Sequence, residues 1–155
     1  MKAICLSDIH GNDVKYRKLC GYIKQTLPDA VFIAGDVLPN YYVTEPLEFI
    51  DDTLKPLLSD LKEEMKQAYP DIFLITGNDD AAVSCEHLRY LELKGLIHFA
   101  NKMVMDQKGY TVLGYPYVPP TPFLLKDWEK YDVSRYLPRD TVSPEDGIRT
   151  VDVPA

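Results

Sequence analysis

Cysteine is scarce in this sequence, and no CxxC pair is present. Cys5, Cys20 and Cys85 are far apart, and their number is odd, so the sequence indicates neither a disulfide framework nor a thiolate zinc site. A few unpaired cysteines are typical of a protein in a reducing compartment. We therefore expect a cytoplasmic protein.

Long uncharged apolar runs are also missing. The apolar share is 46%, and no stretch reaches the roughly 18 residues that a membrane span requires. Residues 1–10 contain one lysine and a short apolar segment, but no small-residue cleavage site follows. We interpret them as a buried strand rather than a signal peptide, and we expect no association with a membrane.

The chain has no excess of positive charge. Its formal charge is −7 and its pI is about 4.9, so the chain as a whole repels polyanions. We therefore expect no broad binding to nucleic acid. The length of 155 residues fits a single domain with one core.

Three short apolar segments predict strands of a parallel sheet. They lie at residues 2–7, 30–34 and 72–76, and each ends at Asp, Gly or both. Their composition is that of strands buried on both faces. The apolar spacing between them predicts one helix that begins near Asn12 and a second that is interrupted at Pro56.

The next part of the chain continues the alternation. A third helix is predicted over residues 82–94, with Gly95 at its C-terminal end. Strands are predicted at 96–99, 103–106 and 110–113. This order of elements predicts a layered α/β fold.

Polar residues gather at the ends of the first three predicted strands. They form the segments 8–12 (Asp-Ile-His-Gly-Asn), 35–36 (Gly-Asp) and 77–80 (Gly-Asn-Asp-Asp). Each segment alone is common in turns and helix caps. Parallel strands bring their carboxyl ends to one edge of the sheet, so the three together predict a metal site there.

The segments SDIHGN, AGDVLPN and TGNDD resemble the first three signature blocks of the calcineurin-like metallophosphoesterases. The resemblance covers about the first 115 residues. It implies the layered metallo-dependent phosphatase fold, an α/β/β/α sandwich, of which this chain carries the N-terminal half. Residues 1–115 would form that half, and residues 116–155 a proline- and aromatic-rich extension of the same domain.

The resemblance also implies a set of metal ligands. Asp8 and His10 would bind the first of two divalent ions, Asp36 would bridge both, and Asn78 would bind the second. Oxygen ligands with one imidazole and no thiolate suit manganese, iron or zinc, and we favour manganese. The implied reaction is hydrolysis of a phosphodiester or a small phosphomonoester by metal-activated hydroxide.

Asp36, Asn78 and Asp79 are the catalytic candidates, and Asn12 and Asn78 are the candidates for substrate binding. Asp79 stands where many family members have a histidine that contacts the phosphate. A carboxylate there repels a phosphate oxygen unless it is protonated or turned away. Smaller phosphodiesterases of the family also lack that histidine, so the change favours diesters. For Asn12, capping of the following helix is an equal alternative.

The family's later blocks supply three more ligands, and nothing after Asp80 resembles them. We interpret His87 and His98 as packed or surface histidines. The second ion then has only two ligands, so we expect either a missing C-terminal half or a homo-oligomer. We also expect the chain alone to expose a large apolar patch.

Other functions stay open at this point. A non-catalytic protein-interaction scaffold on the same fold is the main alternative, favoured by the missing ligands. A receiver domain fits poorly, because adjacent acids do not follow the first strand. A dinucleotide-binding fold lacks its GxGxxG segment.

Overall fold

The computed structural model describes residues 1–42 and 45–151. Its main sheet has four parallel strands in chain order: β1 (Ala3–Leu6), β2 (Ala30–Ala34), β3 (Asp71–Ile75) and β4 (His98–Phe99). Every pairing is parallel, as the apolar segments predict. Only β4 is much shorter than expected, because only its two residues pair with β3.

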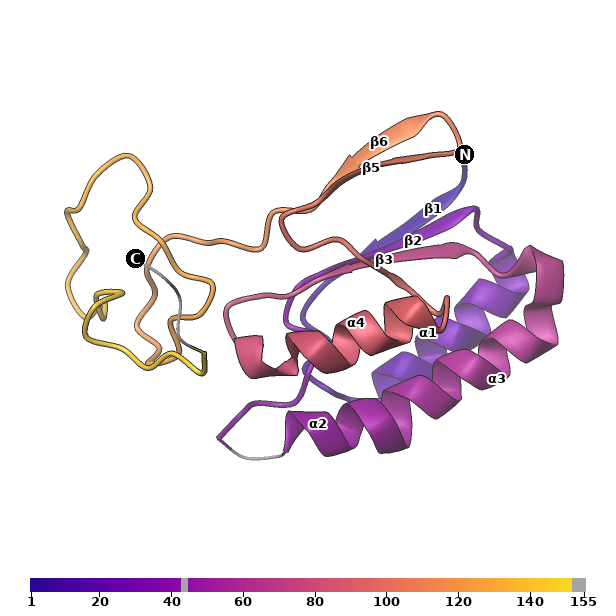
Figure 1. Cartoon of the computed structure of the whole chain (residues 1–155), viewed down its shortest axis with the longest axis horizontal. Coiled ribbons are helices and arrows are strands. Elements are labelled where there is room, and N and C mark those ends of the chain that lie inside the picture. The colour runs from indigo at the N-terminus through magenta and orange to yellow at the C-terminus, as the bar shows by residue number, and fades with distance from the viewer. Residues whose placement is uncertain (43–44, 152–155) are drawn as a thin grey trace.

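The helices lie on one face of this sheet. They are α1 (Asp13–Thr26), α2 (Pro46–Phe49), α3 (Lys55–Met65) and α4 (Cys85–Leu93). Right-handed crossovers between strands that follow chain order bring every connecting helix to the same side. Figure 1 shows this arrangement, with a two-stranded hairpin on the opposite side. No helix in the described part of the chain is long and apolar enough to cross a membrane.

The interruption predicted at Pro56 is present as a wide turn. A π-helical segment, Ile50–Leu54, joins α2 to α3, and the N–H of Lys55 bonds to Ile50 O, five residues back. Proline lacks an N–H and crowds the preceding turn, so a wider turn accommodates it without ending the helix. Two short 3₁₀ turns, Lys66–Ala68 and Ala82–Ser84, complete the helical elements of the described residues.

The main core lies between the sheet and the helices. Its fully buried side chains come from α1, β2, the π-helical segment, α3, β3, α4 and β4: Tyr16, Ile23, Val31, Ile50, Leu54, Leu61, Leu74, Leu88 and Phe99. Each such burial stabilises the fold by about 1.5–3 kcal/mol. This core holds the sheet and the helices together and so fixes the positions of the strand ends.

The expectation that the first three strands are buried on both faces is wrong for β1. Ala3 and Cys5 are exposed, whereas β2 and β3 are mostly buried. β1 lies at the edge of the sheet, and its side chains that point away from the helices stay in contact with solvent.

The hairpin consists of β5 (Val104–Gln107) and β6 (Tyr110–Leu113). Asp71 at the start of β3 anchors it: the carboxylate accepts from Gln107 Nε2 at 3.0 Å and pairs with Lys108 Nζ at 2.7 Å. His98 Nε2 lies 3.1 Å from the same carboxylate. Burial raises the pKa of Asp71, but these partners outweigh it, so the pKa lies below its usual value.

Residues 116–151 form neither helix nor strand, as their composition predicts, apart from two isolated bridges. They are nevertheless packed: five consecutive residues, 125–129, are buried. Trp128 Nε1 donates to Asp80 O at 2.7 Å, and Asp127 accepts from Ala82 N at 2.7 Å. This segment therefore packs against the loop after β3. The boundary at residue 115 stays a prediction.

Candidate metal centre

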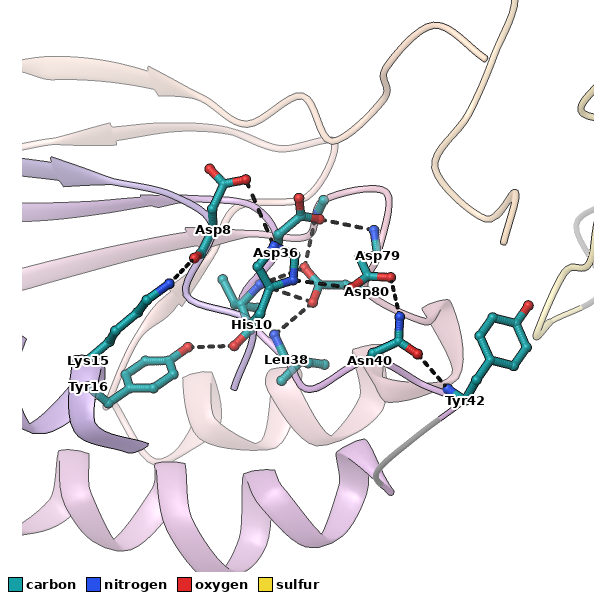
Figure 2. Close-up of polar contacts among 12 residues, drawn as sticks. Asp8, His10, Lys15, Tyr16, Asp36, Leu38, Asn40, Tyr42, Asp79 and Asp80 are labelled. Carbon is teal, nitrogen blue, oxygen red and sulfur yellow. Dashed lines mark hydrogen bonds and ion pairs between the residues drawn. The ribbon is translucent and has the colours of Figure 1, made fainter. Parts of the chain in front are cut away.

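Loops from three neighbouring strands meet at the carboxyl edge of the sheet. Asp8 and His10 follow β1, Asp36 follows β2, and Asp79 follows β3 (Figure 2). Backbone hydrogen bonds join the first two loops, from Asp8 N to Gly35 O at 3.2 Å and from His10 N to Asp36 O at 2.8 Å. Asp79 N donates to Asp36 Oδ1 at 3.0 Å, which adds the third loop.

Three of the predicted ligands converge. Asp8, His10 and Asp36 each offer one ligand atom, and these atoms all lie within 4.8 Å of one another. Two carboxylates and an imidazole match the donors that manganese, iron or zinc accept. Asp8 and His10 are exposed and Asp36 is partly exposed, so an ion has access from solvent. The donor set therefore fits a divalent metal.

All three of these residues have left-handed backbone conformations. The φ angles are 57° at Asp8, 50° at His10 and 50° at Asp36. Residues with a Cβ rarely adopt this backbone conformation, and each instance costs about 1 kcal/mol. Such strain collects at functional sites, where the surrounding structure holds it in place.

Two glycines allow the loops after β2 and β3 to touch. A Cβ on Gly35, whose φ is +94°, would lie 2.9 Å from Gly77 Cα. A Cβ on Gly77 would lie 2.8 Å from Asp36 Cγ and closer still to the backbone N of Asp36. The position of Asp36 therefore depends on the absence of a side chain at Gly77.

Asp80 ties the same two loops together from inside. Its carboxylate is fully buried and accepts from three backbone N–H groups: Val37 at 3.0 Å, Leu38 at 2.8 Å and Gly77 at 2.8 Å. Burial raises the pKa of Asp80 to about 7, although the three donors lower it. Asp80 thus serves as a structural link beneath the candidate ligands.

Asp79 is also fully engaged. Its Oδ2 lies 3.2 Å from His10 Nδ1, and its Oδ1 accepts from Asn40 Nδ2 at 2.9 Å. Burial, with the nearby charge of Asp36, raises the pKa of Asp79, and the neighbouring His10 lowers it in part. Figure 2 shows the Asp79 side chain pointing toward these two partners.

The remaining predicted residues occupy different places. Asn78 lies in the loop after β3, between Gly77 and Asp79, and is partly buried. Asn12 caps α1, because its Oδ1 accepts from Lys15 N at 3.0 Å. Its role toward a substrate stays a prediction.

The other two histidines lie outside this cluster. His87 Nδ1 is 3.4 Å from Asp51, and His98 pairs with Asp71 at the base of the hairpin. Both contacts agree with the interpretation of these histidines as packed or surface residues.

Sequence reasoning missed three residues that shape the site. Asn40 and Asp80 stand within the recognised segments, but their hydrogen bonds depend on how the loops fold over one another. Trp128 is far along the chain, and only its burial potential indicated that it packs against something.

Of the comparisons with known proteins, one identifies the family. The family model described as calcineurin-like phosphoesterase matches residues 1–152. The search of curated proteins gave no significant match. One solved crystal structure is similar with a TM-score of 0.47 and 17% sequence identity, and the match covers 70% of this chain and 49% of that one. The chain thus spans about half the length of that structure.

Proposed function

The chain belongs to the calcineurin-like phosphoesterase family, and from this premise we propose that it hydrolyses phosphoesters with a metal site built on Asp8, His10, Asp36 and Asn78. The observation that carries the proposal is the convergence of Asp8, His10 and Asp36 within 4.8 Å. Metal-dependent hydrolysis of phosphoesters is the general activity of this family.

The chemistry explains why these side chains are needed. Bound divalent ions lower the pKa of water and offset the charge that develops on a phosphoryl group. Asp36 lies between the loop with Asp8 and His10 and the loop with Asn78, and this position supports a bridging role. We propose that Asp36 bridges the ions, and that Asn78 contributes a ligand and a contact to the substrate.

We propose a phosphodiester as the preferred substrate class. Asp79 takes the place of the histidine that many family members use against the phosphate, and its two oxygens are bonded to His10 and Asn40. The chain thus offers no imidazole at this position to protonate a leaving group. A small phosphomonoester is the second choice.

The ligand count gives the second ion an incomplete site. Among the described residues, the first position has Asp8, His10 and Asp36, and the second has only Asp36 and Asn78. We propose that the second ion gains its remaining ligands from outside these residues, either from a C-terminal half or from a second copy. Manganese is the favoured metal, and the free cysteines support a cytoplasmic location.

The decisive experiment measures metal binding before activity. Calorimetric titration of the metal-free chain with Mn²⁺ should give one tightly held ion, and Asp36→Ala should abolish it. Asp60→Ala, an exposed carboxylate on α3, is the control and should bind as wild type does. Unchanged binding in Asp36→Ala would refute the assigned site.

Activity is then measured with bis-p-nitrophenyl phosphate and p-nitrophenyl phosphate in the presence of Mn²⁺. Once the second site is completed, we expect faster turnover of the diester than of the monoester, and no turnover in Asp36→Ala. Faster turnover of the monoester would refute the proposed substrate class.

A scaffold role is a second candidate, and one observation favours it. The hairpin carries large apolar side chains in solvent: Val104 is 66% exposed and Leu113 69% exposed. Such a surface is typical of contact with a partner. A scaffold would keep that contact in Asp36→Ala, whereas the proposed enzyme would lose its function.

A further inference from the structure

Both oxygens of the Asp79 carboxylate are occupied by protein groups. One oxygen faces His10 Nδ1 at 3.2 Å, and the other accepts from Asn40 Nδ2 at 2.9 Å. The side chain is only 25% exposed, and its own backbone N–H holds Asp36. A carboxylate held in this way has little freedom to turn toward a phosphate.

The His10 ring has two distinct sides. Nδ1 faces the Asp79 carboxylate, whereas Nε2 faces Asp8, 4.0 Å from its Oδ1. A neutral imidazole carries one N–H donor and one lone pair. Both neighbours are carboxylates, but only Asp79 lies within hydrogen-bond distance of the ring, so this network assigns the proton to Nδ1 and leaves the lone pair of Nε2 directed toward Asp8.

Asn40 fixes the position of Asp79 from the other side. Its Oδ1 accepts from Tyr42 N at 3.0 Å while its Nδ2 donates to Asp79. The amide orientation is therefore set by both ends, because a flipped amide would lose both bonds. A continuous series of hydrogen bonds runs from Tyr42 through Asn40 and Asp79 to His10 (Figure 2).

We propose that Asp79 is a positioning residue that selects the Nδ1–H tautomer of His10 and aims Nε2 at the metal position, and that Asn40 holds Asp79 for this task. Carboxylates that receive the second N–H of a ligating histidine are common, and their loss weakens metal binding. The proposal rests on the proposed function for the identity of the ligand. Under this proposal, Asp79 acts through His10 and not on the substrate itself.

The tautomer is tested without metal. Long-range ¹H–¹⁵N NMR spectra of the metal-free chain at about pH 8.5, above the ordinary histidine pKa, distinguish the protonated ring nitrogen. We expect Nδ1–H for His10 in the wild type and a shift toward Nε2–H, the tautomer that free histidine prefers, in Asp79→Ala. An Nε2–H tautomer in the wild type would overturn the proposal.

Mn²⁺ titration by calorimetry supplies the second readout. Asp79→Ala should weaken binding by about 10–100-fold. Asp79→Asn keeps an acceptor oxygen and should weaken it less, and Asn40→Ala should change it in the same direction. If Asp79→Ala does not fold, Asp79→Asn and Asn40→Ala still test whether Asp79 positions His10.

The matched control is Asp71→Asn, which alters a carboxylate–histidine pair away from the cluster, with His98. It should bind Mn²⁺ as the wild type does. Equal affinity in wild type, Asp79→Asn and Asn40→Ala would overturn the proposal. Complete loss of Mn²⁺ binding in Asp79→Ala, with the His10 tautomer unchanged from the wild type, would also overturn it, because Asp79 would then be a ligand.

If the wild type binds no Mn²⁺, the proposed function fails, and the NMR result still decides whether Asp79 sets the His10 tautomer. The two failures are therefore distinguishable.

Discussion

Replacement of Gly77 by alanine should destabilise the fold and displace a candidate ligand. The added Cβ would lie 2.8 Å from Asp36 Cγ, whereas ordinary contact begins at 3.4 Å, so the two loops must separate by at least 0.6 Å (3.4 minus 2.8). Rotation of the Asp36 side chain cannot relieve the clash, because the backbone N of Asp36 lies closer still. Overpacking of this kind costs about 1–3 kcal/mol.

Gly21 provides a control of opposite sign. It lies within α1, and a Cβ there would meet nothing within 4 Å. Alanine in the interior of a helix is more stable than glycine by about 0.5–1 kcal/mol. Gly21→Ala should therefore raise stability, while Gly77→Ala lowers it.

Both variants are compared by urea unfolding and by thermal unfolding, each monitored by circular dichroism. A loss of about 2 kcal/mol in Gly77→Ala corresponds to a fall in Tm of roughly 4–8 °C for a domain of this size. Mn²⁺ affinity should fall in Gly77→Ala and stay unchanged in Gly21→Ala. The reasoning is wrong if the two variants gain stability alike, or if Gly77→Ala binds Mn²⁺ as tightly as the wild type.

Two further predictions concern contacts outside the ligand cluster. Trp128→Phe removes the donor to the carbonyl of Asp80 and should lower the free energy of unfolding by about 1–3 kcal/mol, measured by urea denaturation; a change near zero would show that this bond contributes nothing. Asp71 has a lowered pKa, so its partners stabilise the fold above its ordinary pKa of 3.8, and that contribution is lost as pH falls through the lower pKa of the folded state. The stability difference between wild type and Asp71→Asn should therefore narrow below about pH 4, and a constant difference would contradict the assigned cause.

The parallel sheet was predictable because apolar runs and strand-end motifs follow from local sequence. The segments at Asp8, Asp36 and Asn78 could be placed at one edge, since parallel strands share a direction. The solvent exposure of one face of β1 could not be predicted, because an apolar strand has the same sequence pattern whether or not another layer covers it. Its exposure depends on the order of the strands and on where the hairpin lies.

Side-chain roles within the loops were less accessible. Asp79 and Asp80 are adjacent and identical in type, yet one contacts His10 and the other is buried beneath two loops. Nothing in the dipeptide separates these roles, because they depend on backbone directions after β3. Asn40 reaches Asp79 across 39 positions of sequence, a distance that no short motif records.

The left-handed residues Asp8, His10 and Asp36 have a consequence for protein engineering. Their conformations cost the chain roughly 3 kcal/mol in total, an appreciable fraction of the 5–15 kcal/mol that holds a typical domain folded. Glycine would relieve this strain at each position. Directed evolution for heat resistance selects for stability and not for metal binding, so a stabilisation campaign on this chain must keep these three positions fixed.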